Sequence, residues 1–253
     1  RDFDLPAEDR TEYRLHISAD SRYRLYINGE WVGDGPARSF YWAQQFDTYN
    51  AAGLLREGRN TIAVLVSHYG EGTFQYNPSG QAGLLVQLER GHSTGGLSGM
   101  QDTGGQSASG TNIPGGIKAA SDRTGSGTKA AGGTTGTKWE PVLVTDESWR
   151  VRVHEGYLRP TVRISCQMPF EEIVDARRIP IDWMAPGGTL PDARPATIVA
   201  PVGGGPWKTM VARTVPFLTR EPVMPVRLWK ARPVRMPDLH TGFTTRPYLL
   251  AGY

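Results

Sequence analysis

Cysteine is nearly absent from this 253-residue sequence, which holds a single one, Cys166. A lone cysteine excludes an intramolecular disulfide and a cysteine-based zinc site, so we expect the hydrophobic core to stabilise the fold. No apolar run approaches the roughly 20 residues that a transmembrane helix needs, and we expect no membrane partner. The N-terminal stretch RDFDLPAEDR lacks an initiator Met and the apolar centre of a signal peptide, which favours a cut or processed polypeptide. Nothing in the sequence assigns a cellular compartment.

Segments with helical periodicity are also scarce, and alternation with period two dominates instead. Apolar residues alternate with polar ones in four runs, which predict half-buried strands: Tyr13, Leu15 and Ile17; Tyr23, Leu25 and Ile27; Leu84, Val86 and Leu88; and Trp149, Val151 and Val153. The stretch NTIAVLV, residues 60–66, is apolar on both faces and predicts a central strand. Short helices are expected only near Ala51 to Leu55 and Phe170 to Ala176.

Many short strands separated by Gly and Pro indicate an all-β fold, an antiparallel β-sandwich of jelly-roll type. We expect this first domain to cover residues 1–220. From Glu221 an alternating pattern restarts between prolines, which predicts that residues 221–253 are the opening strands of a second, incomplete β domain.

Residues 92–137 have a different composition, dominated by Gly, Ser, Thr and Ala. Such a segment buries too little apolar surface to offset its ordering entropy, so we expect a flexible insertion. It falls between the predicted strands GLLVQLE and PVLVTDESW and should extend a hairpin connection without disturbing the core.

The net charge of +3 is unevenly spread, because seven Lys and Arg residues crowd positions 208–235. A basic stretch of this kind raises the hypothesis of a nucleic-acid partner. Here the basic residues alternate with Val, Leu and Met, as on the solvent face of strands, and no recognition helix or aromatic RNA motif accompanies them. We therefore expect no nucleic acid.

Two loops carry the residue types of a sugar site. Asn28-Gly29 predicts a type I′ hairpin turn, and the following Gly- and Pro-containing loop holds Asp34 and Arg38 near Trp42. The later stretch HYGEGTFQYN adds Glu71 and Tyr76, with His68, Tyr69 and Phe74 beside them. Carbohydrate sites combine an aromatic face for the pyranose ring with fixed polar groups for its hydroxyls, so we expect carbohydrate binding at Asp34, Arg38, Trp42, Glu71 and Tyr76.

Structural roles are the alternative for the same residues. Trp42 and Tyr49 would then belong to the core, Arg38 would pair with Asp34 or Asp47, and the loops would pack on neighbouring domains. Calcium held by Asp20, Asn28 or Asp34 is a further alternative, since oxygen ligands suit this ion, but no EF-hand-like spacing supports it. No other cofactor or metal is expected.

No catalytic residues are expected in this sequence. Glu171 and Glu172 are typical of the first turn of a short helix, and Asp146 and Glu147 of a turn before Trp149. The sequence has no HExxH motif, no P-loop and no G-x-S-x-G elbow, and the GGGP at residues 203–206 lacks the lysine and helix of a phosphate cradle.

Three stretches taken together carry a family resemblance: ADSRYRLYINGEWVGDGPARS, then QQFDTYNAAGLLREGRNTIAVLVSHYGEGTF, then TDESWRVR. In this order they resemble the N-terminal β-sandwich region of bacterial α-L-rhamnosidases. YINGEWVG alone is less specific, because galactose-binding-like sandwiches carry a similar strand and turn.

The resemblance implies a modular, inverting glycoside hydrolase that removes terminal L-rhamnose from glycosides. Its catalytic carboxylates would lie on an (α/α)6 barrel C-terminal to the sandwiches, outside this chain. Two functions follow as hypotheses: a non-catalytic portion that supports the catalytic domain of the same polypeptide, or an autonomous carbohydrate-binding module. A supporting domain should expose a broad apolar surface, and a module should have a polar exterior with one aromatic-rimmed cleft.

Overall fold

The structure is a computed structural model that describes residues 1–7, 12–74, 76–77, 79–93, 137–159, 161, 167–168, 170–180, 182–219 and 221–233. The chain divides into two compact units. The first comprises Arg1–Gly72, Tyr76–Val153 and Pro180–Arg213, and the second comprises Thr73–Gln75, His154–Ile179 and Thr214–Tyr253. Across the described ranges, no helix has the length and apolar character needed to cross a bilayer.

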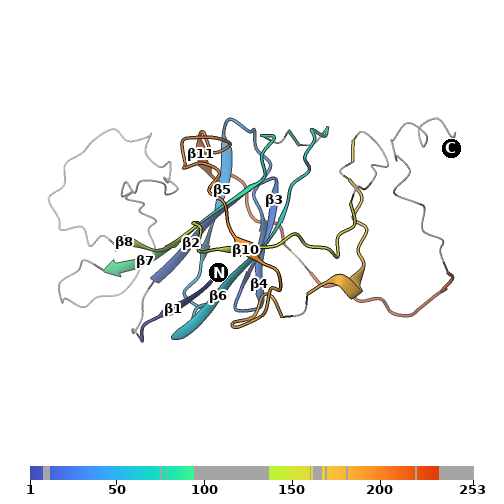
Figure 1. The fold of residues 1–253 in the computed structure, drawn as a ribbon, viewed down its shortest axis with the longest axis horizontal. Helices are drawn as coiled ribbons and strands as arrows, with labels where there is room; N and C mark the ends of the chain where they lie inside the picture. The colour runs from blue at the N-terminus through green and yellow to red at the C-terminus, as the bar shows by residue number, and fades with distance from the viewer. Residues whose placement is uncertain are drawn as a thin grey trace. The chain divides into compact units, whose positions relative to one another are not determined.

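The first unit contains two main β-sheets (Figure 1). One has the strand order β1-β6-β3-β4, with bounds Asp2–Leu5, Gly58–Ser67, Arg22–Ile27 and Glu30–Gly35. The other has the order β11-β5-β2-β7-β8, with bounds Met210–Ala212, Gln44–Asn50, Glu12–Asp20, Gly83–Ser93 and Thr137–Val144. All pairs are antiparallel except β11 with β5. A small third sheet pairs β9 (Arg150–Val151) with β10 (Arg194–Pro195).

The core lies between the two main sheets. It consists of the apolar residues that alternate with polar ones along the strands. Leu15 and Ile17 of β2, Leu25 and Ile27 of β3 and Leu88 of β7 are fully buried and belong to one apolar cluster. Side chains of successive strand residues point to opposite faces, so one apolar set from each sheet meets the other. The predicted all-β sandwich is confirmed, and β6 lies inside its sheet as predicted for NTIAVLV.

The predicted Asn28-Gly29 turn is confirmed. Both residues have positive φ, 53° and 88°, as a type I′ turn requires. The Asn28 side chain has a second role, because its Nδ2 donates to the Leu54 carbonyl at 2.9 Å and to Asn60 Oδ1 at 2.8 Å. Its Oδ1 accepts from the Thr61 backbone N–H at 2.9 Å. The turn is therefore joined to the neighbouring strand β6.

Two glycines in β4 are explained by polar side chains of β5, in the other main sheet, and of β3. A Cβ on Gly33 would lie 2.4 Å from the Tyr49 hydroxyl, and one on Gly35 would lie 2.0 Å from Asp47 Oδ2. The Tyr23 hydroxyl donates to Asp47 and lies 3.0 Å from the Tyr49 hydroxyl. Burial and the charge of Asp47 raise the pKa of the Tyr23 phenol far above its usual range. The GDG sequence thus leaves room for a buried polar group between the sheets.

A second, smaller apolar cluster covers the outer face of the five-stranded sheet. Phe46 of β5 and Leu85 of β7 pack there with Trp207 and Met210. These two late residues bring the chain segment around β11 back onto the sheet. The sequence between residues 196 and 213 therefore completes the first unit.

Both helix predictions are wrong. Around residues 51–55 there is a single turn, in which the Leu54 and Leu55 N–H groups both donate to the Ala51 carbonyl. In residues 170–176 the backbone pairs with another segment, since the Asp175 N–H donates to Gly156 O and the Ile173 carbonyl accepts from Leu158 N–H. The described residues contain only a 3₁₀ turn, η1, at Ala176–Arg178, capped by the Asp175 side chain.

The run from Trp149 to Val153 is also not the half-buried strand that its alternation predicts. Trp149 is buried and its Nε1 donates to the Val144 carbonyl at 2.9 Å. Val151 and Val153 are exposed by 50% and 57%. Within the described residues, the two-residue β9 pairs only with β10.

The predicted insertion does extend a hairpin, because β7 and β8 are antiparallel and Ser93 pairs with Thr137. Residues 94–136 lie outside the described residues. Residues 221–233, the described part of the expected second β domain, carry no strand, and residues 234–253 lie outside the description. The division into domains 1–220 and 221–253 stays a prediction.

Candidate carbohydrate-binding end of the sandwich

Strand register places the two candidate loops at one end of the sandwich. Asp20 at the end of β2 pairs with Gly83 at the start of β7, and Arg22 at the start of β3 pairs with Ser67 at the end of β6. β4 ends and β5 begins at this same end, because Tyr23 pairs with Gly35 and β5 runs antiparallel to β2. The connections 36–43 and 68–82 therefore emerge together (Figure 1).

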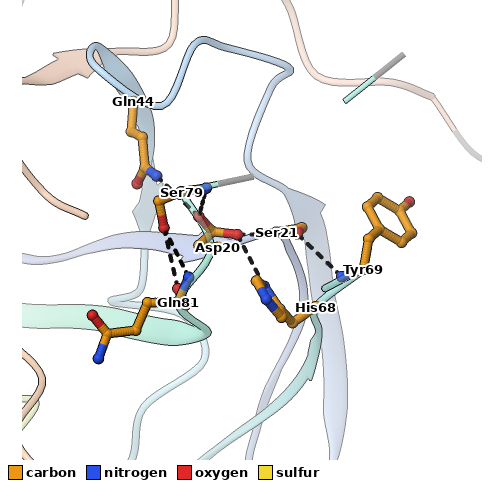
Figure 2. A network of polar contacts seen from close by, with 7 residues as sticks. All are labelled: Asp20, Ser21, Gln44, His68, Tyr69, Ser79 and Gln81. Atoms are coloured by element: carbon orange, nitrogen blue, oxygen red, sulfur yellow. Dashed lines mark hydrogen bonds and ion pairs between the residues drawn. The ribbon is translucent and has the colours of Figure 1, made fainter. Parts of the chain in front are cut away.

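A buried carboxylate, that of Asp20, joins these two connections (Figure 2). Its Oδ2 accepts from the Ser79 backbone N–H at 2.8 Å and from Gln44 Nε2 at 3.5 Å. Its Oδ1 accepts from the Ser21 hydroxyl at 3.0 Å and lies 3.1 Å from His68 Nδ1. Buried carboxylates require such partners, so Asp20 fixes the base of both loops.

The same carboxylate orients His68. A carboxylate only accepts, so the proton of a neutral His68 ring is assigned to Nδ1 and the lone pair to Nε2. The His68 side chain is 19% exposed. Next to it, Tyr69 and Tyr76 meet edge to face with centroids 5.5 Å apart. Burial and the charge of Asp20 raise the pKa of the Tyr76 phenol well above its usual range, so this hydroxyl stays protonated.

The connection 36–43 ends in a tight turn made of three aromatic residues. The Ala43 N–H donates to the Phe40 carbonyl at 3.0 Å and closes the turn. Phe40, Tyr41 and Trp42 are nevertheless exposed by 62%, 39% and 49%. The Phe40 and Trp42 rings stack at 4.5 Å with an interplanar angle of 10°, and Tyr41 meets Trp42 edge to face at 4.8 Å.

The five predicted sugar-binding residues are distributed unevenly over this end. Trp42 belongs to the turn formed by Phe40, Tyr41 and Trp42, and Tyr76 lies beside the Asp20 network. Arg38 and Glu71 are exposed on the two connections. Asp34 lies within β4, where its Oδ1 accepts from Arg24 Nε at 3.1 Å. Sugar binding by these five residues stays a prediction.

The structural alternatives for these residues are partly wrong. Trp42 is exposed and is not a core residue, whereas Tyr49 packs against the core. Asp47 pairs with Arg213 and not with Arg38. For the calcium alternative, Asn28 lies at the far end of β3 from Asp20, so these two cannot share an ion. Within the described ranges, no group of three His, Cys, Asp or Glu side chains is arranged to hold a metal.

Sequence reasoning missed the role of Asp20 in joining the two connections, together with its partners Gln44 and Ser79. No local sequence pattern indicates this arrangement, because it depends on tertiary contacts such as that between Asp20 and Ser79, which lie 59 residues apart. It also missed Phe40 and Tyr41. The signal for those was present, since FYW places three aromatics next to each other in a segment with no strand pattern.

Comparison with known proteins agrees with this architecture. Residues 8–92 match the family described as the α-L-rhamnosidase N-terminal domain. None of the curated proteins matches the chain. Among solved structures, the GH78 family rhamnosidase of Bacillus sp. GL1 is 32% identical, over 86% of this chain and 18% of that one, with a TM-score of 0.62.

Two further rhamnosidase structures are more distant. The α-L-rhamnosidase from Dictyoglumus thermophilum is 18% identical, over 85% of this chain and 18% of that one, with a TM-score of 0.53. The Streptomyces avermitilis α-L-rhamnosidase complexed with L-rhamnose is 19% identical, over 77% of this chain and 15% of that one, with a TM-score of 0.48.

The fold and these matches define the class of protein as an N-terminal β domain of a glycoside hydrolase. More narrowly, the chain is the N-terminal domain region of an α-L-rhamnosidase (GH78) and matches the N-terminal part of rhamnosidase structures. It spans 18% of the length of the Bacillus and Dictyoglumus structures.

Proposed function

We propose that this chain is a non-catalytic β-sandwich portion of an enzyme that removes terminal L-rhamnose from glycosides, and that it supports an (α/α)6-barrel catalytic domain. The observation that carries the proposal is a run of exposed apolar side chains in the second unit. Eight large ones are exposed: Val215, Phe217, Leu218, Val223, Met224, Val226, Leu228 and Trp229.

Exposure of this extent is unusual for a surface that only faces water. Val226 is 100% exposed and Val223 91%, and the eight side chains fall within fifteen consecutive positions. Large contiguous apolar surfaces mark protein interaction sites. An autonomous carbohydrate-binding module would present a polar exterior with one aromatic-rimmed site, so this segment favours a supporting domain over a module.

The chemistry of the buried carboxylates supports a non-catalytic role. Inverting hydrolysis needs an acid and a base about 6.5–9.5 Å apart with a water between them. Asp20 is held by Ser21, Ser79 and His68. Asp47 and Glu89 are likewise committed, the former to Arg213 and the latter to Arg14. These groups stabilise the sandwich.

Hydrolysis of an aryl α-L-rhamnoside tests the proposal on two polypeptides, the 253-residue chain and the product of the complete gene. We expect the complete product to release the aryl alcohol and the chain alone to release none. The proposal fails if the chain itself is active and loses activity when one of its carboxylates is changed to the amide. It fails equally if the complete gene product does not cleave rhamnosides.

A further inference from the structure

The turn at Phe40, Tyr41 and Trp42, here called the aromatic turn, is a surface that the supporting role does not explain. Tight turns usually carry Gly, Asn, Asp, Ser or Pro, because these residues adopt turn conformations readily and keep the surface polar. Here three consecutive aromatic side chains are exposed by 39% to 62%. Single exposed apolar residues are common, but a contiguous group of three indicates binding.

We infer that the aromatic turn is a carbohydrate-binding platform, on which the apolar face of a pyranose ring stacks. The turn offers flat apolar surface to solvent, because stacking hides only one face of each of the Phe40 and Trp42 rings. A pyranose presents patches of C–H groups that pack on such rings, while its hydroxyls remain in water or bind polar neighbours.

The backbone of the aromatic turn is held in place before any ligand arrives. The Ala43 N–H closes the turn, and the Gln45 N–H donates to the Ser39 hydroxyl at 3.2 Å. The Gln44 N–H donates to the Thr209 carbonyl at 2.9 Å, and its side chain reaches the buried Asp20. A platform fixed on both sides loses little conformational entropy on binding.

The size of the aromatic turn favours a sugar over a protein partner. About half of three aromatic side chains of 150–250 Å² each is on the order of 300 Å². A specific protein interface buries about 800 Å² on each partner. One or two pyranose rings fit the smaller area. The exposed Arg38 on the same connection adds N–H donors suited to hydroxyl oxygens.

Titration of the 253-residue chain with methyl α-L-rhamnopyranoside, followed by ¹H–¹⁵N NMR to tens of millimolar, tests the inference. The choice of this sugar rests on the proposed function, so methyl glycosides of glucose and galactose are titrated in parallel. We expect shift changes at the Trp42 indole N–H and at amides 38–45. Trp42→Ala should weaken binding about tenfold.

The matched control is Trp31→Ala. Trp31 is also exposed, by 41%, but lies at the start of β4, next to the hairpin turn at the opposite end of the sandwich. This variant should bind the sugar as the parent chain does. Circular dichroism and the thermal midpoint establish that both variants fold.

Two outcomes would overturn the inference. One is the absence of shifts with all three sugars. The other is unchanged sugar affinity in Trp42→Ala, combined with weaker association of domains in the complete gene product, which would make the aromatic turn an interdomain contact. Because binding is measured without hydrolysis, either result leaves the proposed supporting role standing.

Discussion

Asp47 and Arg213 lie 166 residues apart in the sequence and form a two-point ion pair, with Nε 2.6 Å from Oδ1 and Nη2 3.3 Å from Oδ2. The Asp47 side chain is fully buried and that of Arg213 is 12% exposed. The pair joins the segment after β11 to β5. The Asp47 carboxylate also accepts a hydrogen bond from the Tyr23 hydroxyl.

Loss of Arg213 should therefore destabilise the sandwich strongly. Arg213→Met leaves a buried carboxylate without its cation, and we expect the free energy of unfolding to fall by about 3 kcal/mol. Urea denaturation followed by tryptophan fluorescence measures it. The control is Arg59→Met, which removes the exposed partner of Asp2 and should change little. Equal effects of the two substitutions would contradict a special role of the buried pair.

Gly35→Ala should be severely destabilising, because the new Cβ would lie 2.0 Å from Asp47 Oδ2 and 2.7 Å from the Tyr23 hydroxyl. We expect a loss of at least about 3 kcal/mol or failure to fold. Gly53→Ala is the matched control, since a Cβ there meets no atom within 4 Å. Thermal unfolding of the two variants measures the difference in stability. A Gly35→Ala protein as stable as the parent would refute the close approach of Asp47 and Tyr23 to Gly35.

The Asn28 side chain should contribute to stability separately from its backbone conformation. Asn28→Gly keeps the positive φ but removes the hydrogen bonds to Leu54, Asn60 and Thr61, and should cost about 2 kcal/mol. Asn28→Ala should cost about 1 kcal/mol more, because alanine resists positive φ. Chemical denaturation of both gives the two contributions. Wild-type stability of Asn28→Gly would show that the side-chain bonds contribute nothing.

Glu89 should make stability depend on pH in the acid range. Burial opposes its charge, but hydrogen bonds from His16 and Arg14 outweigh this and lower the pKa of Glu89 from 4.5 to about 2. A depressed folded-state pKa stabilises the protein above pH 4.5, and this stabilisation is lost as the pH falls towards 2. The shift corresponds to on the order of 3 kcal/mol.

The check for Glu89 is urea denaturation at several pH values between 7 and 2. Glu89→Gln should lower stability at pH 7 and flatten the profile below pH 4.5. The exposed Glu147, changed to Gln, should leave the profile as it is. A wild-type profile that matches that of Glu89→Gln would refute the depressed pKa.

Replacing residues 94–136 by a two-residue Asn-Gly turn should leave the thermal midpoint nearly unchanged. Ser93 and Thr137 already pair across the hairpin, and closure entropy grows only slowly with the length of the connection. Differential scanning calorimetry measures the midpoint. A loss of several kcal/mol would mean that this segment packs on the sandwich, against the expectation from its composition.

Alternation and turn chemistry were enough to predict the sandwich. The inward residues Leu15, Ile17 and Leu25, the Asn28-Gly29 turn and the central place of β6 were all readable, because each depends on neighbours in the sequence. The helix predicted near residues 170–176 is wrong because backbone pairing between residues 156–158 and 173–175 replaces local hydrogen bonds, and the one predicted near residues 51–55 stops after a single turn. Val151 and Val153 alternate correctly, yet their side chains stay exposed by 50% and 57%.

The candidate site was only partly readable for the same reason. Residue types placed Trp42 and Tyr76 in it, but the role of Asp20 depends on bonds to Gln44, His68 and Ser79, which are distant in sequence. No pattern within one segment encodes such contacts.

The Asp20 carboxylate also divides this end of the molecule into positions that can diversify and positions that cannot. Substitutions at exposed loop positions such as Arg38 and Glu71 change the loop surface without touching the buried charge, whereas Tyr76 interacts with Asp20 and belongs to the fixed positions. Changes at Asp20 itself would remove the hydrogen-bond partner of Gln44, His68 and Ser79 at once. A library randomised at residues 36–42 and 70–74, with Asp20, Gln44, His68, Tyr76 and Ser79 held constant, would thus vary the recognition surface of the sandwich and keep its framework.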